Sequence, residues 1–331
     1  MLARIPLLLA LVGLTLDTGL AMPPPKPTRI EKKLEKHGDV RIDPYMWLHD
    51  RESPKVIQHL KDENAYTEFV LKDTEKLQAK LYEEIKGRIE KNDQSAPYSH
   101  HGYSYYTRTE GEGEYPIYCR RKGSMEGPEE ILVDGNKRAV GHKYFSMTAP
   151  SLSPDERYMA YAVDTQGRRF YTIEVYDRKN GKRILSLEKT KGNFEWAEDS
   201  KTIVYSRQDP TTLRSYQILR RTLGELKSEL IFEEKDTTFE VAVSKSLSER
   251  LLFISSTSTT TSEVHFLPSD KVKSQPTLVQ PRIRGLEYSV EDGGDRLYIL
   301  TNSNAQNFQV METTRDKPSM ANWKTVVPHN P

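Results

Sequence analysis

A strand pattern that recurs along most of the chain limits what it can fold into. In four places a basic residue follows a polar turn and opens an apolar strand, and these residues are Arg157, Lys201, Arg250 and Arg296. Their spacings are 44, 49 and 46 residues (201−157, 250−201 and 296−250). A repeat of this length, with several short strands in each unit, is typical of a β-propeller. The sequence therefore predicts a mainly β fold built from four-stranded blades.

The second unit shows the pattern most clearly. Residues 153–156 form a turn in which Pro154 fixes φ and Asp155 bonds its own backbone. An apolar run follows at 158–163, and every second residue is then apolar at 171–176, as in a half-buried strand. Asn180-Gly181 predicts a hairpin turn before a last strand at 183–187. These strands together make one blade.

Four other units are expected from the same pattern. A less regular first unit begins near residue 96 and pairs strands at 103–106 and 116–119. The third unit runs from 194 to 232, the fourth from 239 to about 280, and the fifth closes near 327. We therefore assign residues 93–331 to a partial β-propeller of about five blades.

Charge composition excludes some classes of partner. The 331 residues include 49 Lys and Arg against 48 Asp and Glu, so the net charge is +1. Charges of both signs are mixed along the chain, which is typical of a solvated surface. No overall field attracts nucleic acid or an anionic membrane. We expect neither as a partner.

Residues 1–21 resemble an export signal. Arg4 precedes an apolar stretch at 5–16, and Gly19-Leu20-Ala21 supplies the small residues that a signal peptidase needs. The stretch is short for a membrane span. We predict export to the periplasm or the medium, with a mature chain from Met22. Alternatives are a buried N-terminal helix, or translation from Met22 and a cytoplasmic protein.

Residues 22–92 differ in character from the repeats. A proline-rich lead and an extended, aromatic segment reach about residue 50. Ser53 with Pro54 predicts a helix start, and this helix extends to about residue 71. Thr74 is the expected cap of a second helix that Gly87 ends. Its apolar face, formed by Leu77, Leu81 and Ile85, implies a further domain on which it packs.

Several separated short segments of the sequence resemble one family of enzymes. These segments lie at residues 37–48, 63–68, 115–120, 134–136, 141–146 and 260–264. The first two are similar to the N-terminal segment of the prolyl oligopeptidase family of serine peptidases. The others are similar to its oligopeptidase B branch. The resemblance extends from about residue 24 to the last residue.

The resemblance implies a two-domain peptidase that cleaves short peptides after Arg or Lys. In the family a seven-bladed propeller covers an α/β-hydrolase domain, which carries the Ser, Asp and His of the catalytic triad, and the propeller selects substrates by size. This sequence ends after about five blades of the expected seven and has no Gly-x-Ser-x-Gly nucleophile elbow. The hydrolase domain is therefore expected to be absent, and we predict that this chain alone is catalytically inactive.

No residue is predicted to ligate a metal or bind a cofactor. None of the histidines has a zinc-type spacing; they are His37, His49, His59, His100, His101, His142, His265 and His329. His100 and His101 are the one close pair, but adjacent residues of a strand point to opposite faces, which disfavours joint ligation. Gly111-Glu112-Gly113 opens no helix, so it is interpreted as a hairpin loop and not as a phosphate-binding loop.

The remaining conspicuous residues have structural interpretations. The carboxylate pairs Glu129-Glu130 and Glu233-Glu234 are interpreted as exposed charge at strand edges or loops. Cys119, the one cysteine, is expected to be a small buried hydrophobe. The three tryptophans are expected to pack between blades; they are Trp47, Trp196 and Trp323.

Three hypotheses about function follow. The chain is the N-terminal part of an oligopeptidase B-like peptidase, or an exported binding module that acts alone, or one half of a split peptidase that a separate catalytic half completes in trans. Short peptides are partners only if a hydrolase domain is supplied. An open ring would expose strand edges and the apolar helix face, so we expect the isolated chain to be unstable or to aggregate.

Overall fold

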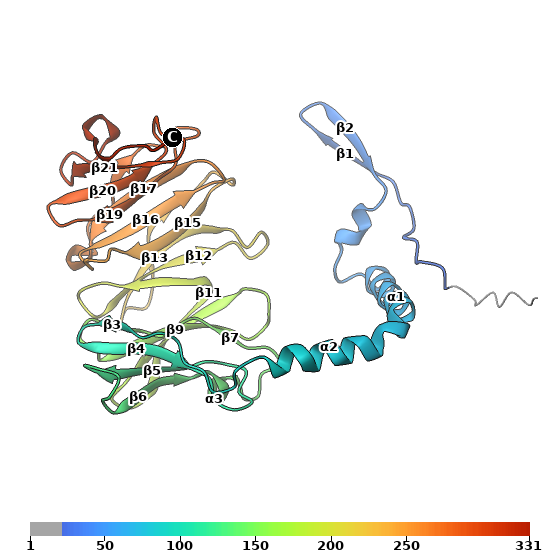
Figure 1. Ribbon diagram of the computed structural model, residues 1–331. Coiled ribbons are helices and arrows are strands. Elements are labelled where there is room, and N and C mark those ends of the chain that lie inside the picture. Colours follow the sequence, from blue (N-terminus) through green and yellow to red (C-terminus); the bar gives the residue numbers. More distant parts are fainter. Residues whose placement is uncertain (1–21) are drawn as a thin grey trace, which may run out of the picture. The chain divides into compact units, whose positions relative to one another are not determined.

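The computed structural model describes residues 22–331, and the predicted signal peptide at 1–21 lies outside them (Figure 1). The chain divides into two compact units, the first ending at Glu90 and the second spanning Lys91–Pro331. Within the described residues, no helix is both long enough and apolar enough to cross a membrane.

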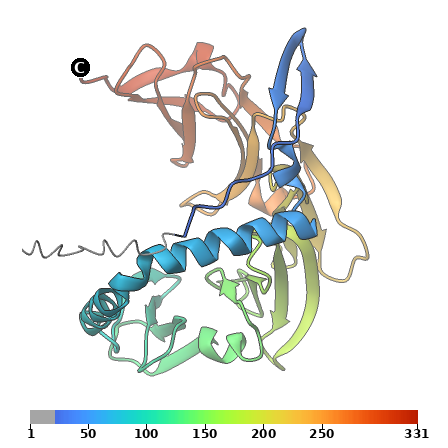
Figure 2. The ribbon, with the colours of Figure 1, turned by 90° about the vertical axis from the view of Figure 1, so that its right-hand side faces the viewer.

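The second unit is built from antiparallel β-sheets that follow one another in chain order along a curved path (Figure 2). The first sheet contains β3 (Tyr98–His100), β4 (Tyr103–Arg108), β5 (Ile117–Lys122) and β6 (Glu129–Asp134). A short helix, α3 (Gly135–Ala139), follows it. The Asp134 carboxylate caps this helix by accepting hydrogen bonds from the backbone N–H groups of Asn136 and Lys137.

The next sheet has eight strands because two blades share one long strand. Its strands are β7 (Ser146–Met147), β8 (Ser151–Leu152), β9 (Tyr158–Asp164), β10 (Tyr171–Asp177), β11 (Lys182–Trp196), β12 (Thr202–Gln208), β13 (Ser215–Thr222) and β14 (Glu229–Glu233). The first part of β11 pairs with β10 and the last part with β12. It is therefore the outer strand of one blade and the inner strand of the next.

A glycine lies where β11 passes between the two blades. Gly192 has φ +84°, and a Cβ there would lie 3.1 Å from the Tyr171 ring and 3.3 Å from the Ala162 Cβ. A larger residue would be strained by the positive φ and would also lie too close to these neighbours. Sequence analysis predicted two separate blades here and missed the continuity of the strand.

Two four-stranded sheets complete the unit. One contains β15 (Glu240–Lys245), β16 (Leu251–Thr257), β17 (Ser262–Pro268) and β18 (Thr277–Gln280). The other contains β19 (Tyr288–Asp292), β20 (Arg296–Thr301), β21 (Gln309–Thr314) and β22 (Lys324–Val327). Short 3₁₀ turns, η3 (Ser269–Lys271) and η4 (Met320–Asn322), precede β18 and β22. The five predicted blades are confirmed.

The turn between the first two strands of a blade has the same hydrogen bonds in successive blades. The backbone N–H groups of Ser153, Ala197 and Ser246 donate to the carbonyls of Tyr158, Thr202 and Leu251 at 2.9, 2.8 and 2.9 Å. The last turn residue then adopts a left-handed conformation, with φ +57° at Glu156, +59° at Ser200 and +61° at Glu249. This turn explains why a polar cluster precedes each apolar strand at the observed period.

The core lies within and between neighbouring blades. One apolar cluster joins the second and third blades and includes the Trp196 side chain, which is 2% exposed. Another joins the fourth and fifth blades and includes Trp323, 7% exposed. Packing between blades is confirmed for these two tryptophans. The same prediction is wrong for Trp47, which belongs to the first unit and donates its indole N–H to the Thr28 carbonyl at 2.8 Å.

The first unit contains a hairpin and two helices. The hairpin is formed by β1 (Lys32–Lys36) and β2 (Asp39–Asp43), and the 3₁₀ turn η1 (Met46–His49) follows it. Sequence analysis predicted only an extended segment here. His37 and Gly38 both have positive φ, +54° and +79°, which is the geometry of a tight two-residue hairpin turn.

The two predicted helices are confirmed, but their capping is not. Helix α1 (Pro54–Leu71) begins after Ser53, and α2 (Glu75–Gly87) follows the 3₁₀ turn η2 (Lys72–Thr74). Neither Ser53 nor Thr74 makes a side-chain capping bond. The Thr74 hydroxyl instead donates to the Leu71 carbonyl at 2.6 Å, because η2 continues the chain in a helical conformation.

The apolar face of α2 is open to solvent in this unit. Leu77, Leu81 and Ile85 are 54%, 45% and 60% exposed. A stripe of this kind on a helix is normally buried against another element. The exposure agrees with the expectation that α2 needs a further partner surface.

Candidate binding site at the inner strands of the propeller

A cavity of about 480 Å³ lies within the second unit, among the inner strands and turns of four blades. The first blade contributes Tyr98, His100, His101 and Tyr105, and the second contributes residues 148–154 and Glu156. The third contributes residues 192–195, and the fourth contributes Lys245 and Glu249. A volume of this size is in the range of small-ligand sites.

Charged side chains from different blades meet at this cavity. Lys245 Nζ lies 2.7 Å from Glu198 Oε1 and 3.7 Å from Glu249 Oε2. Glu156 pairs with Arg120 of the first blade at 2.8 Å. The pairs Lys245–Glu198 and Glu156–Arg120 each join two blades, so the rim of the cavity depends on several blades keeping their places.

Glu195 is a half-buried carboxyl group in the cavity wall. Burial raises its pKa to about 7, opposed by the charge and the backbone of Lys245, and the neighbouring Glu249 carboxylate adds to the rise. The group therefore gains and loses its proton near neutral pH. None of the sequence patterns indicated this residue, because its environment is made by the fourth blade.

Replacing Glu195 with glutamine is expected to stabilise the chain by about 1 to 2 kcal/mol at pH 8 and not at pH 4.5. The folded chain keeps the Glu195 proton up to about pH 7, whereas an unfolded chain releases it near the ordinary value of 4.5. Stability is therefore lost as pH rises through this window, and a side chain that cannot ionise avoids the loss. Urea unfolding midpoints with EDTA present measure the difference.

The matched control is Glu188→Gln on the same strand. Glu188 is exposed, so its replacement should leave the unfolding midpoint unchanged at both pH values. An E195Q effect of equal size at pH 4.5 and 8 would contradict the assigned protonation of Glu195.

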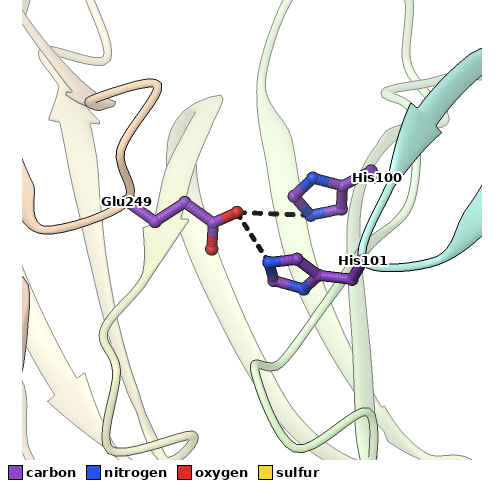
Figure 3. Close-up of side chains that lie close together, drawn as sticks. All are labelled: His100, His101 and Glu249. Atoms are coloured by element: carbon purple, nitrogen blue, oxygen red, sulfur yellow. Dashed lines mark ion pairs between the residues drawn. The ribbon is translucent and has the colours of Figure 1, made fainter.

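His100 and His101 lie side by side and both face Glu249 (Figure 3). Their rings are stacked, with centroids 4.0 Å apart and an angle of 18° between the planes. The Nε2 atoms of His100 and His101 lie 3.6 and 3.0 Å from Glu249 Oε1. Among the residues that the structure describes, these three form the group whose ligating atoms lie close enough together to share one metal ion.

The prediction that the two histidines point to opposite faces is wrong. Only His100 belongs to strand β3; His101 lies in the turn before β4 and has φ +46°. The left-handed backbone at His101 breaks the alternation of a strand and returns its ring to the side of His100. Spacing along the chain also missed Glu249, which is 148 residues beyond His101 (249−101).

The interpretation of the carboxylate pairs as exposed charge is wrong for two of the four residues. The Glu129 side chain is 23% exposed and contacts Arg108, and the Tyr106 hydroxyl donates to it at 2.6 Å. The hydrogen bonds from Arg108 and Tyr106 lower the pKa of Glu129 to about 2. Glu234 is 4% exposed and pairs with Arg282 at 2.6 Å. Glu129 is half-buried and Glu234 is buried, and each is paired with an arginine from another part of the chain, which offsets the loss of water around its charge.

Two other interpretations are confirmed. Cys119 is 1% exposed, and burial raises the pKa of its thiol to about 11, so it is a buried protonated side chain. Gly111-Glu112-Gly113 lies in the loop between β4 and β5, which pair as a hairpin. The prediction that the chain has no catalytic residue is not tested by these positions and stays a prediction.

The other histidines are dispersed. His37 lies in the β1–β2 turn, His49 ends η1 and His59 is on α1. His142 follows α3, and His329 follows β22. His265 is on β17, where burial lowers its pKa.

Comparison with known proteins agrees with this architecture. Residues 24–331 match the family model "Prolyl oligopeptidase, N-terminal beta-propeller domain". Protease 2 of Moraxella lacunata is 36% identical over 293 residues, which are 86% of this chain and 42% of that protein. Dipeptidyl aminopeptidase BI of Pseudoxanthomonas mexicana is 34% identical over 318 residues, covering 88% of this chain and 43% of that protein.

Solved structures show the same fold. Oligopeptidase B from Leishmania major superposes with a TM-score of 0.85 at 29% identity, over 94% of this chain and 47% of that one. Oligopeptidase B from Trypanosoma brucei gives a TM-score of 0.84 at 29% identity, over 93% of this chain and 46% of that one.

The fold and these matches define a propeller domain of a peptidase family. The chain belongs to the prolyl oligopeptidase family, of which it carries the N-terminal β-propeller domain, and it is close to oligopeptidase B and Protease 2. It spans less than half the length of these relatives, and the catalytic domain lies outside the part that it covers.

Proposed function

We propose that this chain is the propeller part of an oligopeptidase B-like serine peptidase that hydrolyses short peptides after Arg or Lys. The observation that carries the proposal is the likeness to two oligopeptidase B structures over more than nine tenths of the chain. The exposed apolar face of α2 supports it, because that face requires a partner surface. The catalytic half is supplied by a further part of the polypeptide or in trans.

The role of the propeller in this proposal is to admit substrates by size. The cavity of about 480 Å³ at the inner strands is large enough for a few extended residues and far too small for a folded domain. In this proposal a substrate reaches the catalytic centre past these strands, so a flexible peptide enters and a folded domain is kept out. Specificity by exclusion of this kind needs no contact that recognises a particular side chain.

Hydrolysis requires a nucleophile, a base and an oxyanion hole that act together. In this proposal all three belong to the catalytic half. The purified chain alone should therefore leave a fluorogenic Arg-Arg peptide amide uncleaved. Adding the purified part of Moraxella lacunata Protease 2 that this chain does not match should produce cleavage if the halves associate. Turnover by the chain alone would contradict the proposal.

Export is the proposed route of this protein. The support is the order of basic, apolar and small residues in 1–21. Expression of the full chain in a bacterium should release a product whose N-terminal sequence begins at Met22 in the periplasmic fraction. A cytoplasmic product that retains Arg4 would contradict export, and a cytoplasmic product from Met22 would favour the alternative start.

A further inference from the structure

Two turns that are distant in the sequence bring three metal-binding side chains to one point. His100 and His101 come from the β3–β4 hairpin of the first blade, and Glu249 comes from the β15–β16 turn of the fourth. Their ligating atoms all lie within 4.8 Å of one another. Figure 3 shows the two imidazole rings on one side and the carboxylate facing them.

We propose that His100, His101 and Glu249 form a binding site for a divalent transition-metal ion such as Zn²⁺. Two imidazole nitrogens and one carboxylate oxygen are a donor set that suits Zn²⁺ and its neighbours in the first transition row. Ca²⁺ and Mg²⁺ prefer oxygen ligands throughout, so this donor set disfavours them. The inference goes beyond the proposed peptidase function and does not depend on it.

The present distances fit such an ion with little movement. Zn–N and Zn–O bonds of about 2.0–2.1 Å at tetrahedral angles place ligand atoms about 3.3 Å apart. The two nitrogen-to-oxygen distances are 3.0 and 3.6 Å, so each differs from this spacing by a few tenths of an ångström. The imidazole rings, whose planes are 18° apart, would rotate out of their stack so that both Nε2 lone pairs point at one ion.

The site is accessible and partly organised in advance. The side chains of His100, His101 and Glu249 are 47%, 52% and 26% exposed, so an ion can enter from solvent. Water can occupy the position that three protein ligands leave free. Both Nε2 atoms already lie close to the Glu249 carboxylate, which reduces the ordering that binding requires.

The surrounding charges allow the carboxylate to take part. Lys245 contacts the other carboxylate oxygen, Oε2, at 3.7 Å, and it is held more closely by Glu198 at 2.7 Å. Glu249 Oε1 therefore remains directed at the histidines. The Glu198 carboxylate lies 2.7 Å from Lys245 and offsets the repulsion between Lys245 and a cation.

Metal binding at this site would connect the first blade to the fourth. Because the ligands come from both blades, an ion that binds the folded chain and not the unfolded chain raises the stability of the propeller by mass action. The expected signature is thus a stoichiometric binding event and a metal-dependent rise in the unfolding temperature.

The test is titration of the untagged, EDTA-stripped full chain with ZnCl₂ by calorimetry, with CoCl₂ absorption as a second readout. We expect one Zn²⁺ per chain, Co²⁺ absorption bands of a four- or five-coordinate site, and no thermal shift with MgCl₂ or CaCl₂ at the same concentration. Glu249→Gln and His101→Asn should each weaken binding at least about tenfold. Asparagine tolerates the left-handed backbone at position 101, and glutamine keeps the shape of Glu249.

The matched control is His142→Asn, which removes an exposed imidazole outside the cluster and should leave the affinity unchanged. Circular dichroism of each variant without metal establishes whether it is folded. If Glu249→Gln or His101→Asn does not fold, His100→Ala replaces it. Failure of the chain to bind stoichiometric Zn²⁺ would overturn the site. Equal affinity in the wild type and in all folded cluster variants would overturn it as well.

Discussion

Replacing Arg282 with leucine should lower the free energy of unfolding of the chain by about 3 to 5 kcal/mol. The reason is the Glu234 carboxylate, which is 4% exposed and lies 2.6 Å from the Arg282 guanidinium. Without the arginine this carboxylate would remain buried and unpaired. Urea unfolding followed by tryptophan fluorescence measures the loss.

The pair connects two blades, which is why a large effect is expected. Glu234 follows β14 of the third blade, and Arg282 follows β18 of the fourth. The Ser256 hydroxyl also donates to Glu234, and Arg282 lies 4.0 Å above the Phe239 ring. Removing Arg282 therefore disturbs its ion pairs with Glu234 and Glu263 and an aromatic contact together.

The effect should diminish in acid. Burial raises the pKa of Glu234, but hydrogen bonds from Arg282 and Ser256 outweigh it, so the pKa lies below its ordinary value of 4.5. The stabilisation is complete above 4.5 and is lost as pH falls through the lower pKa of the folded chain. The difference between wild type and R282L should shrink below pH 4.5.

Arg284→Leu is the control for this substitution. Arg284 is exposed and lies two residues from Arg282 on the same connection, so its loss should change stability by less than about 0.5 kcal/mol. An equal loss for R282L and R284L would show that the Glu234 ion pair does not carry the effect.

Replacing Trp196 with alanine should also cost about 3 to 5 kcal/mol. Trp196 is 2% exposed in the cluster that joins the second and third blades, and its indole N–H donates to the Ser151 carbonyl at 3.3 Å. Truncation would leave a cavity where β11 passes from one blade to the next. A lower urea midpoint, measured by circular dichroism, is the expected result.

Leu226→Ala is the comparison that separates packing from side-chain size. Leu226 lies in the same blade and is 93% exposed, so its truncation should have little effect on the midpoint. A W196A midpoint equal to that of L226A would contradict the placement of Trp196 in the core.

The third blade could be predicted because its strand β12 is buried on both faces. All the side chains of β12 except Arg207 are buried, and the strand therefore appears in the sequence as an apolar run after a turn. The β1–β2 hairpin was missed because its residues are mostly exposed and give no alternating pattern. The continuity of β11 was missed because Gly192 resembles a turn residue.

The candidate site could not be predicted from spacing along the chain. The Glu234 carboxylate is paired with Arg282, which is 48 positions away in the sequence. The two histidines face Glu249, which is 148 positions beyond His101. Both contacts depend on which blades become neighbours. The one local signal that was available is Gly102 after His101, which indicates a tight turn and hence a break in strand alternation.

The most direct test of the central claim is a chimera that joins this chain to the part of Moraxella lacunata Protease 2 that it does not match. The measurement is the rate of cleavage of a short Arg-containing peptide amide relative to that of a folded protein with exposed arginines. The account predicts efficient cleavage of the peptide and almost none of the folded protein. A folded, active chimera that digests both at similar rates would contradict the claim that this chain is a size-selective peptidase propeller.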